Sequence, residues 1–162
     1  MRFNNLTRVE LENKLDEIKI YMFDLDGVLL KNSEDKENIH QQMTEFCDAQ
    51  RVKNRFAGII TAGDKDALTT RLNELENCFV LTSSLNKEKL MKEKFDQLEL
   101  DFNNLFYMGD DILDLPLLQK AGISCAPSNA RREVKRAVDI VLDEEESYNI
   151  LDTILQLSRK KF

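Results

Sequence analysis

A mostly apolar run that ends abruptly in two carboxylates constrains the fold more than any other part of this sequence. The run extends from Ile18 to Phe23, and Asp24, Asp26 and Gly27 follow it. A short apolar run of this kind is typical of a strand buried on both faces of a parallel sheet. Carboxylates at its carboxyl end lie where open α/β sheets place their ligands, and a hard cation such as Mg²⁺ would satisfy them.

Further apolar runs alternate with segments that have helical spacing. After the first strand we expect strands over 56–61, 78–81, 105–108, 123–126 and 140–142, the last at an edge of the sheet. A capping box at Thr7 and Glu10 opens an N-terminal helix within 1–17. The other expected helices cover 37–50, 66–76, 87–100, 112–120, 131–138 and 147–161, and the acidic segment 143–146 is expected to be a turn.

This alternation predicts an α/β fold of three layers, with a mostly parallel sheet between helices on both faces. At 162 residues the chain is expected to form a single domain over 1–162, with its core over 18–142 between the two terminal helices.

The composition argues against several classes of partner and site and indicates a cellular compartment. The net charge of −7 and the pI of about 4.9 argue against non-specific contacts with nucleic acid or anionic lipid. Three cysteines in apolar contexts and a single histidine, His40, make a zinc site or a disulfide framework unexpected. No segment resembles a membrane span or a secretion signal, so we expect a cytoplasmic protein without nucleic-acid or membrane partners.

Polar residues follow the ends of four expected strands. Since parallel strands direct their carboxyl ends to one edge of the sheet, these residues are expected to meet in one cleft. Each alone is an ordinary strand end, cap or surface charge, but their order along the chain is unusual. The residues concerned are Asp24 and Asp26, Thr61, Lys87, and the acidic group Asp110, Asp111 and Asp114.

These segments together resemble the haloacid dehalogenase (HAD) superfamily of phosphohydrolases, which has a Rossmann-like fold. The four superfamily motifs are matched by the segments 24–28, 59–63, 86–87 and 109–114. Within the superfamily, the spacing of the last two motifs and the segment 121–130 are most similar to the 3-deoxy-manno-octulosonate 8-phosphate phosphatases and their relatives.

The resemblance implies a chemical mechanism. Asp24 is implied as the nucleophile that forms an aspartyl-phosphate, and Asp26 as the general acid and base. Thr61 would hydrogen-bond the phosphoryl group and Lys87 would balance its charge. One Mg²⁺ would be held by Asp24, Asp110 and the backbone carbonyl of Asp26. For Asp111 and Asp114 two roles stay open: one of them orients Lys87 or holds metal-bound water, and Asp114 is otherwise an acid in the first turn of a helix.

The lengths of two gaps predict that the chain has no cap domain. Thr61 follows Asp24 by 37 positions and Lys87 follows Thr61 by 26, which in each case is room for one helix and one strand. In this superfamily such open sites either act on macromolecules or gain walls by oligomerisation, and the resemblance to the sugar-acid phosphatases implies a small phosphorylated metabolite such as a sugar-acid phosphate. A macromolecular substrate, or an interaction module with little turnover, stays an alternative.

A homo-oligomer is a further expectation of the resemblance. The related sugar-acid phosphatases form tetramers through a hairpin after the first motif, where this chain has a short polar segment at 29–38.

Overall fold

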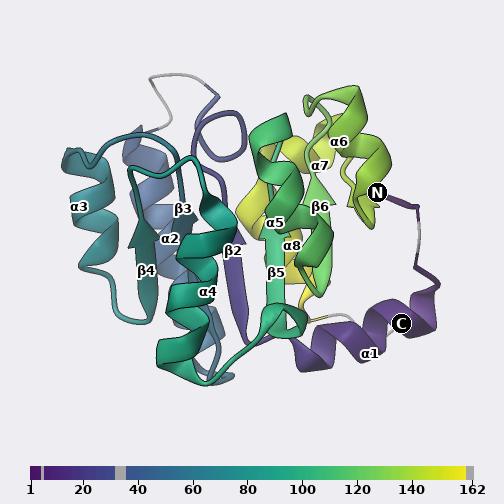
Figure 1. Cartoon of the computed structure of the whole chain (residues 1–162), viewed down its shortest axis with the longest axis horizontal. Coiled ribbons are helices and arrows are strands. Elements are labelled where there is room, and N and C mark those ends of the chain that lie inside the picture. The colour runs from purple at the N-terminus through teal and green to yellow at the C-terminus, as the bar shows by residue number, and fades with distance from the viewer. Residues whose placement is uncertain (5, 32–35, 160–162) are drawn as a thin grey trace.

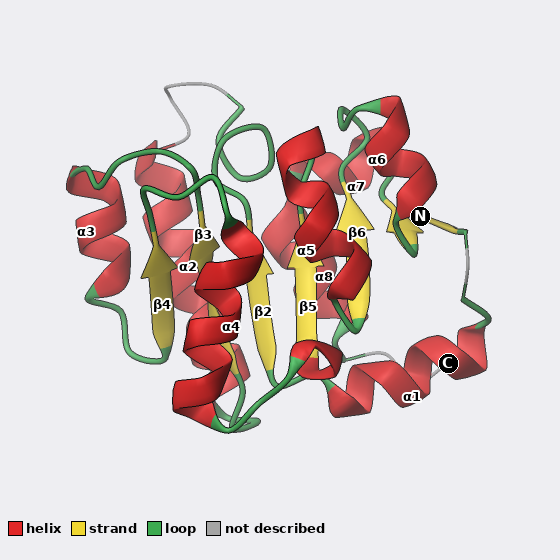
Figure 2. Cartoon of the chain, in the orientation of Figure 1, coloured by secondary structure: helices red, strands yellow, loops and turns green. Residues whose placement is uncertain are grey.

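A seven-stranded sheet forms the centre of the computed structural model, which describes residues 1–4, 6–31 and 36–159 (Figures 1 and 2). The strand order is β1-β7-β6-β5-β2-β3-β4, and all neighbours are parallel except β1 and β7. The strands are β1 (Arg2–Phe3), β2 (Ile20–Phe23), β3 (Phe56–Ile60), β4 (Cys78–Leu81), β5 (Leu105–Met108), β6 (Ile123–Ala126) and β7 (Ile140–Val141). The predicted three-layer, mostly parallel α/β fold is therefore confirmed.

Helices cover both faces of the sheet (Figure 2). One buried cluster joins the sheet to α1 (Arg8–Glu17), α2 (Lys36–Arg51), α3 (Ala67–Asn73) and α8 (Ile150–Leu157). The second cluster, on the opposite face, joins it to α4 (Lys87–Leu98), α5 (Leu115–Lys120) and α6 (Arg132–Ala137). Successive residues of a strand point to opposite faces, so Phe106 belongs to the first cluster and Tyr107 to the second.

The helices begin where the sequence supplies caps. Thr7 and Glu10 form the expected capping box of α1, and Asp66 caps α3 in the same way. Short 3₁₀ segments, η2 (Phe102–Asn104) and η3 (Ile112–Asp114), precede β5 and α5. Part of the segment predicted as helix 112–120 is thus 3₁₀, and Pro116 lies in the first turn of α5, where its missing N–H costs nothing.

Two sequence-based expectations at the C-terminal end differ from the structure. Asp143 caps a short helix, α7 (Glu144–Tyr148), so the acidic segment opens a helix and is not a free turn. The predicted helix 147–161 is interrupted at Asn149 and continues as α8. Carboxylates at Glu144–Glu146 complement the partial positive charge of a helix N-terminus, which favours a helix at this point. Residues 160 and 161 of that prediction lie outside the described residues, as do residues 32–35 of the polar segment 29–38.

A third difference concerns the edge of the sheet. The sequence predicts β7 as an edge strand, but β1 pairs with it in antiparallel orientation and takes the edge position. A two-residue strand is too short to be recognised from its sequence pattern.

The gaps between the motif segments have the expected content. Between Asp24 and Thr61 the described residues form α2 and β3, and between Thr61 and Lys87 they form α3 and β4. In the described part of the chain no helix is both long and apolar enough to cross a membrane.

Candidate active site

The carboxyl ends of β2, β3 and β5 carry the predicted site residues to one edge of the sheet. Asp24 follows β2 directly, and its N–H extends the ladder to the carbonyl of Met108 at 2.9 Å. Thr61 follows β3 and bonds the carbonyl of Leu81 in the same way. The loop after β4 is tied to this edge, since the N–H of Ser83 donates to the carbonyl of Gly63 at 2.9 Å.

Lys87 is a buried cation held by two carboxylates. It is the first residue of α4 and only 4% exposed. Its Nζ lies 2.9 Å from Oδ2 of Asp24 and 2.6 Å from Oδ1 of Asp114. A buried charge is tolerated only when it is paired and hydrogen-bonded, so these two contacts fix the position of the ammonium group.

Asp114 connects Lys87 to the loop after β5. The side chain is fully buried, and its Oδ1 accepts hydrogen bonds from Lys87 and from the hydroxyl of Tyr107. Its Oδ2 accepts the backbone N–H groups of Asp110 and Asp111 at 3.0 and 3.1 Å. Of the two roles that the sequence left open for Asp114, the contacts favour orientation of Lys87.

The side chain of Asp111 does not contact Lys87 or Asp24. Its side chain caps η3 and accepts a hydrogen bond from Nε of Arg131 at 3.1 Å. That side chain is 44% exposed, so the ion pair with Arg131 is a surface contact and contributes at most about 1 kcal/mol to stability.

Two glycines leave the space that the carboxylates need. A Cβ on Gly27 would lie 2.1 Å from Oδ2 of Asp110, and the φ of +81° at Gly27 is strained for any other residue. A Cβ on Gly109 would lie 2.5 Å from Cβ and Cγ of Asp114. These glycines therefore allow Asp110 and Asp114 to pack directly against the backbone.

Burial and like charge raise the pKa of the acidic groups. Desolvation and the charge of Asp114 raise the pKa of Asp24 to about 7, although Lys87 opposes the shift. Desolvation, Asp114 and Asp111 raise the pKa of Asp110 to about 6. Burial by itself would lower the pKa of Lys87, but Asp24 and Asp114 outweigh it and the net shift is upward. Carboxyl groups raised in this way, gathered in a cleft, are typical of functional sites.

The acidic groups are placed to hold a divalent cation. Asp24, Asp110 and Asp114 each offer a carboxylate oxygen, and these atoms lie within 4.8 Å of one another. Both oxygens of Asp114 already accept two hydrogen bonds each, which leaves Asp24 and Asp110 as the better ligands. Hard carboxylate oxygens suit Mg²⁺ and similar ions, so the donor set fits the metal expected from the sequence.

All seven predicted site residues line one cavity of about 320 Å³ at this edge. They are Asp24, Asp26, Thr61, Lys87, Asp110, Asp111 and Asp114. Asp26 is exposed, whereas Asp24 and Thr61 are buried. The structure thus brings together residues that are up to 90 positions apart in the sequence.

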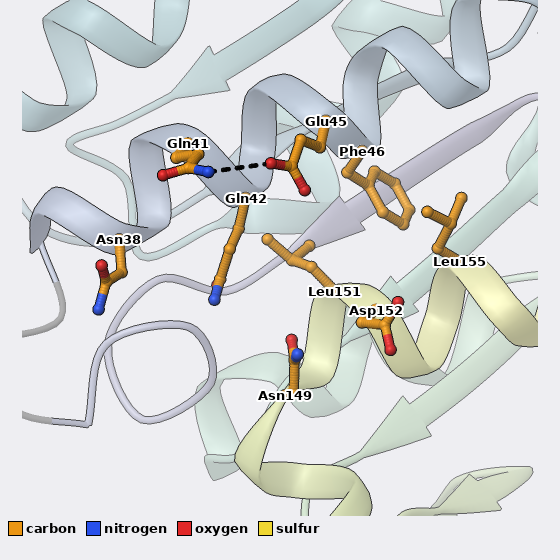
Figure 3. Close-up of a pocket in the computed structure, with 9 residues that line it drawn as sticks. All are labelled: Asn38, Gln41, Gln42, Glu45, Phe46, Asn149, Leu151, Asp152 and Leu155. Carbon is orange, nitrogen blue, oxygen red and sulfur yellow. Dashed lines mark hydrogen bonds between the residues drawn. The ribbon is translucent and has the colours of Figure 1, made fainter.

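A second hollow, of about 300 Å³, lies between α2 and α8 (Figure 3). Amide and carboxylate side chains line it together with Phe46, Leu151 and Leu155. Its one drawn hydrogen bond joins Gln41 to Glu45 within α2 (Figure 3). Since its lining contains neither a buried cation nor a cluster of buried acids, the chemistry favours the cavity at the strand ends.

Tyr107 belongs to the network of Lys87 and Asp114 but is not among the residues predicted from the sequence. Its hydroxyl donates to Oδ1 of Asp114 at 2.6 Å and lies 3.3 Å from Nζ of Lys87. Burial and the nearby carboxylates raise the pKa of Tyr107 well above its ordinary value, so the hydroxyl stays protonated. The signal was present, because a tyrosine inside the buried run 105–108 needs a partner for its hydroxyl.

Comparison with known proteins identifies the family of this chain. The family model of haloacid dehalogenase-like hydrolases matches residues 9–154. A curated relative, the 3-deoxy-D-manno-octulosonate 8-phosphate phosphatase of Haemophilus influenzae, is 27% identical over 145 residues, which cover 82% of this chain and 77% of the relative.

Solved structures of phosphatases of this type have a similar fold. The cobalt-bound Haemophilus influenzae phosphatase of that type is 28% identical, with a TM-score of 0.71 over 90% of this chain and 91% of that one. The Moraxella catarrhalis phosphatase, solved with magnesium, phosphate and KDO, has the same fold, with a TM-score of 0.71, 19% identity and 93% coverage of both chains. With its fold, its four motif segments and the family match over most of its length, this chain belongs to the haloacid dehalogenase-like hydrolases.

Proposed function

We propose that this protein is a Mg²⁺-dependent phosphomonoester hydrolase that acts through an aspartyl-phosphate on a small phosphorylated metabolite. The contact of Lys87 with Asp24, in a cavity that also contains Asp110, carries the proposal. This arrangement supports it because a carboxylate attacks a phosphate dianion only where cations offset the negative charge of both groups.

In the first step, a carboxylate oxygen of Asp24 attacks phosphorus and the bond from phosphorus to the ester oxygen breaks. Lys87 holds Asp24 in place and offsets the charge that develops on the phosphoryl oxygens. Thr61, at the end of the neighbouring strand, offers its hydroxyl to one of those oxygens. Its Oγ1 accepts the N–H of Gly63 at 3.1 Å, so its proton is free to be donated to phosphate.

Asp26 serves the leaving group and then water. It lines the same cavity but is exposed, so it reaches the ester oxygen from the solvent side and donates a proton to it. It then takes a proton from the water that attacks phosphorus, and the bond between phosphorus and Asp24 breaks to release phosphate. One residue acts as acid in the first step and as base in the second.

Asp24, Asp110 and the backbone carbonyl of Asp26 would hold the metal. When bound, Mg²⁺ would neutralise charge on the phosphoryl group and on the two carboxylates. Asp114 keeps the N–H groups of Asp110 and Asp111 in position, which orients the Asp110 side chain toward Gly27.

The names of the relatives support a small phosphorylated sugar as the substrate class. Sugar-acid phosphates, which the relatives are named for, are the first compounds to test, together with other phosphorylated sugars, nucleotides and a phosphorylated peptide.

The test is phosphate release from this panel, with Mg²⁺ and with EDTA. We expect turnover that requires Mg²⁺ and falls by roughly 10³-fold or more in Asp24→Asn, because the amide is not a nucleophile. Gln42→Ala, in the hollow of Figure 3, is the control and keeps the wild-type rate. A folded protein that releases no phosphate from any compound would refute the proposal and favour a binding role. Turnover of the phosphopeptide alone would move the assignment to a macromolecular substrate.

A further inference from the structure

Three exposed apolar side chains lie close to Lys87 and Asp111 in the sequence, Leu85 in the loop before α4 and Ile112 and Leu113 in η3. Leu85 is 69% exposed and precedes Lys87 by two positions, while Ile112 and Leu113 are 47% and 51% exposed and follow Asp111 directly. We call these three residues the apolar rim. They make up half of the large exposed apolar side chains in the described residues, and one of them, Leu113, lines the cavity.

Leu113 adds an apolar surface to the cavity. It lines the same cavity as Asp24, Asp26 and Lys87, and it is the largest apolar side chain of the described lining. When the phosphoryl group lies against Asp24 and Lys87, the organic part of the ester must extend toward the mouth. Its first carbon atoms then come within reach of Leu113. Contact between this apolar side chain and carbon atoms is favourable, whereas contact with a charged group would desolvate the charge.

The charged groups at the mouth of the cavity also favour an uncharged group next to the ester oxygen. Asp26 and Asp111 also line the cavity, and both are accessible to solvent. Arg131 is engaged by Asp111 at 3.1 Å, and Lys87 by Asp24 and Asp114. A carboxylate next to the ester oxygen would therefore lie beside the apolar side chain of Leu113, with no unpaired cation among the described lining residues to offset its charge.

We propose that the apolar rim selects phosphomonoesters whose carbon atoms next to the ester oxygen carry no charged group. This inference rests on the proposed function and narrows its substrate class. An eight-carbon sugar acid phosphorylated at carbon 8 meets the condition, because its carboxylate lies at the other end of the carbon chain. Phosphoglycolate does not, because its carboxylate is one carbon away from the ester oxygen.

The experiment compares two esters of nearly equal size. Ethylene glycol monophosphate and phosphoglycolate differ only in a terminal CH₂OH or carboxylate. We expect wild-type kcat/KM to favour the glycol ester by about tenfold or more. Leu113→Lys places an ammonium group beside the carboxylate and lowers this ratio by about tenfold. Val52→Lys is the matched control: Val52 is 85% exposed in the turn before β3, at the opposite edge of the sheet, and its substitution leaves the ratio unchanged.

A second variant tests the apolar contact itself. Leu113→Asn keeps the approximate size of the side chain but removes its apolar surface. It should lower the preference for n-butyl phosphate over ethylene glycol monophosphate by several-fold, with the effect in KM.

Each contrary result has its own meaning. An unchanged ratio in Leu113→Lys, or a wild-type preference for phosphoglycolate, overturns the rim proposal while turnover itself supports the hydrolase. An equal loss on all esters, accompanied by dissociation of an oligomer in sedimentation velocity, overturns it by making the rim a subunit contact. No phosphate release from any ester overturns the proposed function, and the rim proposal with it.

Discussion

The hydroxyl of Tyr107 donates a 2.6 Å hydrogen bond to Oδ1 of Asp114, and neither side chain is accessible to solvent. The same oxygen contacts Lys87, and the other carboxylate oxygen accepts two backbone N–H groups from the loop that carries Asp110. Asp114 therefore contacts both Lys87, the buried cation, and the backbone of Asp110, a proposed metal ligand. A change in Asp114 is expected to displace both.

Asp114→Asn should destabilise the fold strongly. The variant retains one acceptor, but its NH₂ group faces either the N–H groups of Asp110 and Asp111 or the ammonium of Lys87. Loss of a buried, charged hydrogen-bond partner predicts a decrease of about 2–4 kcal/mol in the free energy of unfolding. Denaturant unfolding measures this change, with Asp152→Asn on the exposed face of α8 as control. Equal stability of the two variants would contradict the role given to Asp114.

Tyr107→Phe tests whether the hydroxyl positions Lys87. The ring stays in the core, and Lys87 loses a neighbour at 3.3 Å while Asp114 loses one at 2.6 Å. We expect kcat to fall by about tenfold with KM changed less than about twofold, because the phosphate still binds but its charge is offset less well.

Tyr21→Phe provides the comparison for that variant. It also removes a buried hydroxyl, one that lies 3.4 Å from Arg55. Similar losses of kcat in both variants would show that a general loss of packing, and not the contact with Lys87, is responsible.

Gly27→Ala should weaken the binding of Mg²⁺. The new Cβ would lie 2.1 Å from Oδ2 of Asp110, and the backbone at φ +81° is strained for alanine, so the Asp110 side chain must move. Displacement of one ligand predicts a loss of about 10–100-fold in metal affinity, measured by calorimetric titration. Gly63→Ala, whose Cβ would lie 3.5 Å from the nearest atom, is expected to change the affinity little. A normal affinity in Gly27→Ala would argue against Asp110 as a ligand.

The stabilisation of the fold by Mg²⁺ should depend on pH. Burial raises the pKa of Asp24 from 3.8 to about 7 and that of Asp110 to about 6. A carboxyl group with a raised pKa binds its proton more tightly in the folded state, so its contribution to stability is present below pH 3.8 and is lost as pH rises toward 7. Protons and Mg²⁺ compete for these oxygens, so added Mg²⁺ should raise the melting temperature more at pH values above about 7 than below about 5.

Thermal unfolding with Mg²⁺ and with EDTA at both pH values checks this expectation. In Asp110→Asn, the difference in Mg²⁺ stabilisation between the two pH values should be mostly lost. An equal stabilisation at the two pH values would contradict the proposed ligands, since it would place the metal away from the titrating carboxyl groups.

Local patterns in the sequence were sufficient for much of this fold. The buried run before Asp24 and the alternation of apolar runs with helical segments predicted the sheet and its helical layers. The lengths of the two gaps predicted the one helix and one strand that the described residues form in each. The prediction failed where the signal was short or ambiguous. β1 has two residues, and the acids after Asp143 suit a turn as well as the first turn of a helix.

For the candidate site, the sequence by itself determined which groups reach the cavity, because the end of each parallel strand fixes the place of the residue that follows it. It did not determine how they pair. Whether Asp111 or Asp114 contacts Lys87, and whether Tyr107 takes part, depends on the 3₁₀ turn after β5 and on the approach of α4 to one face of the sheet. Those relations join residues that are 20 and 27 positions apart, and only tertiary packing sets such distances.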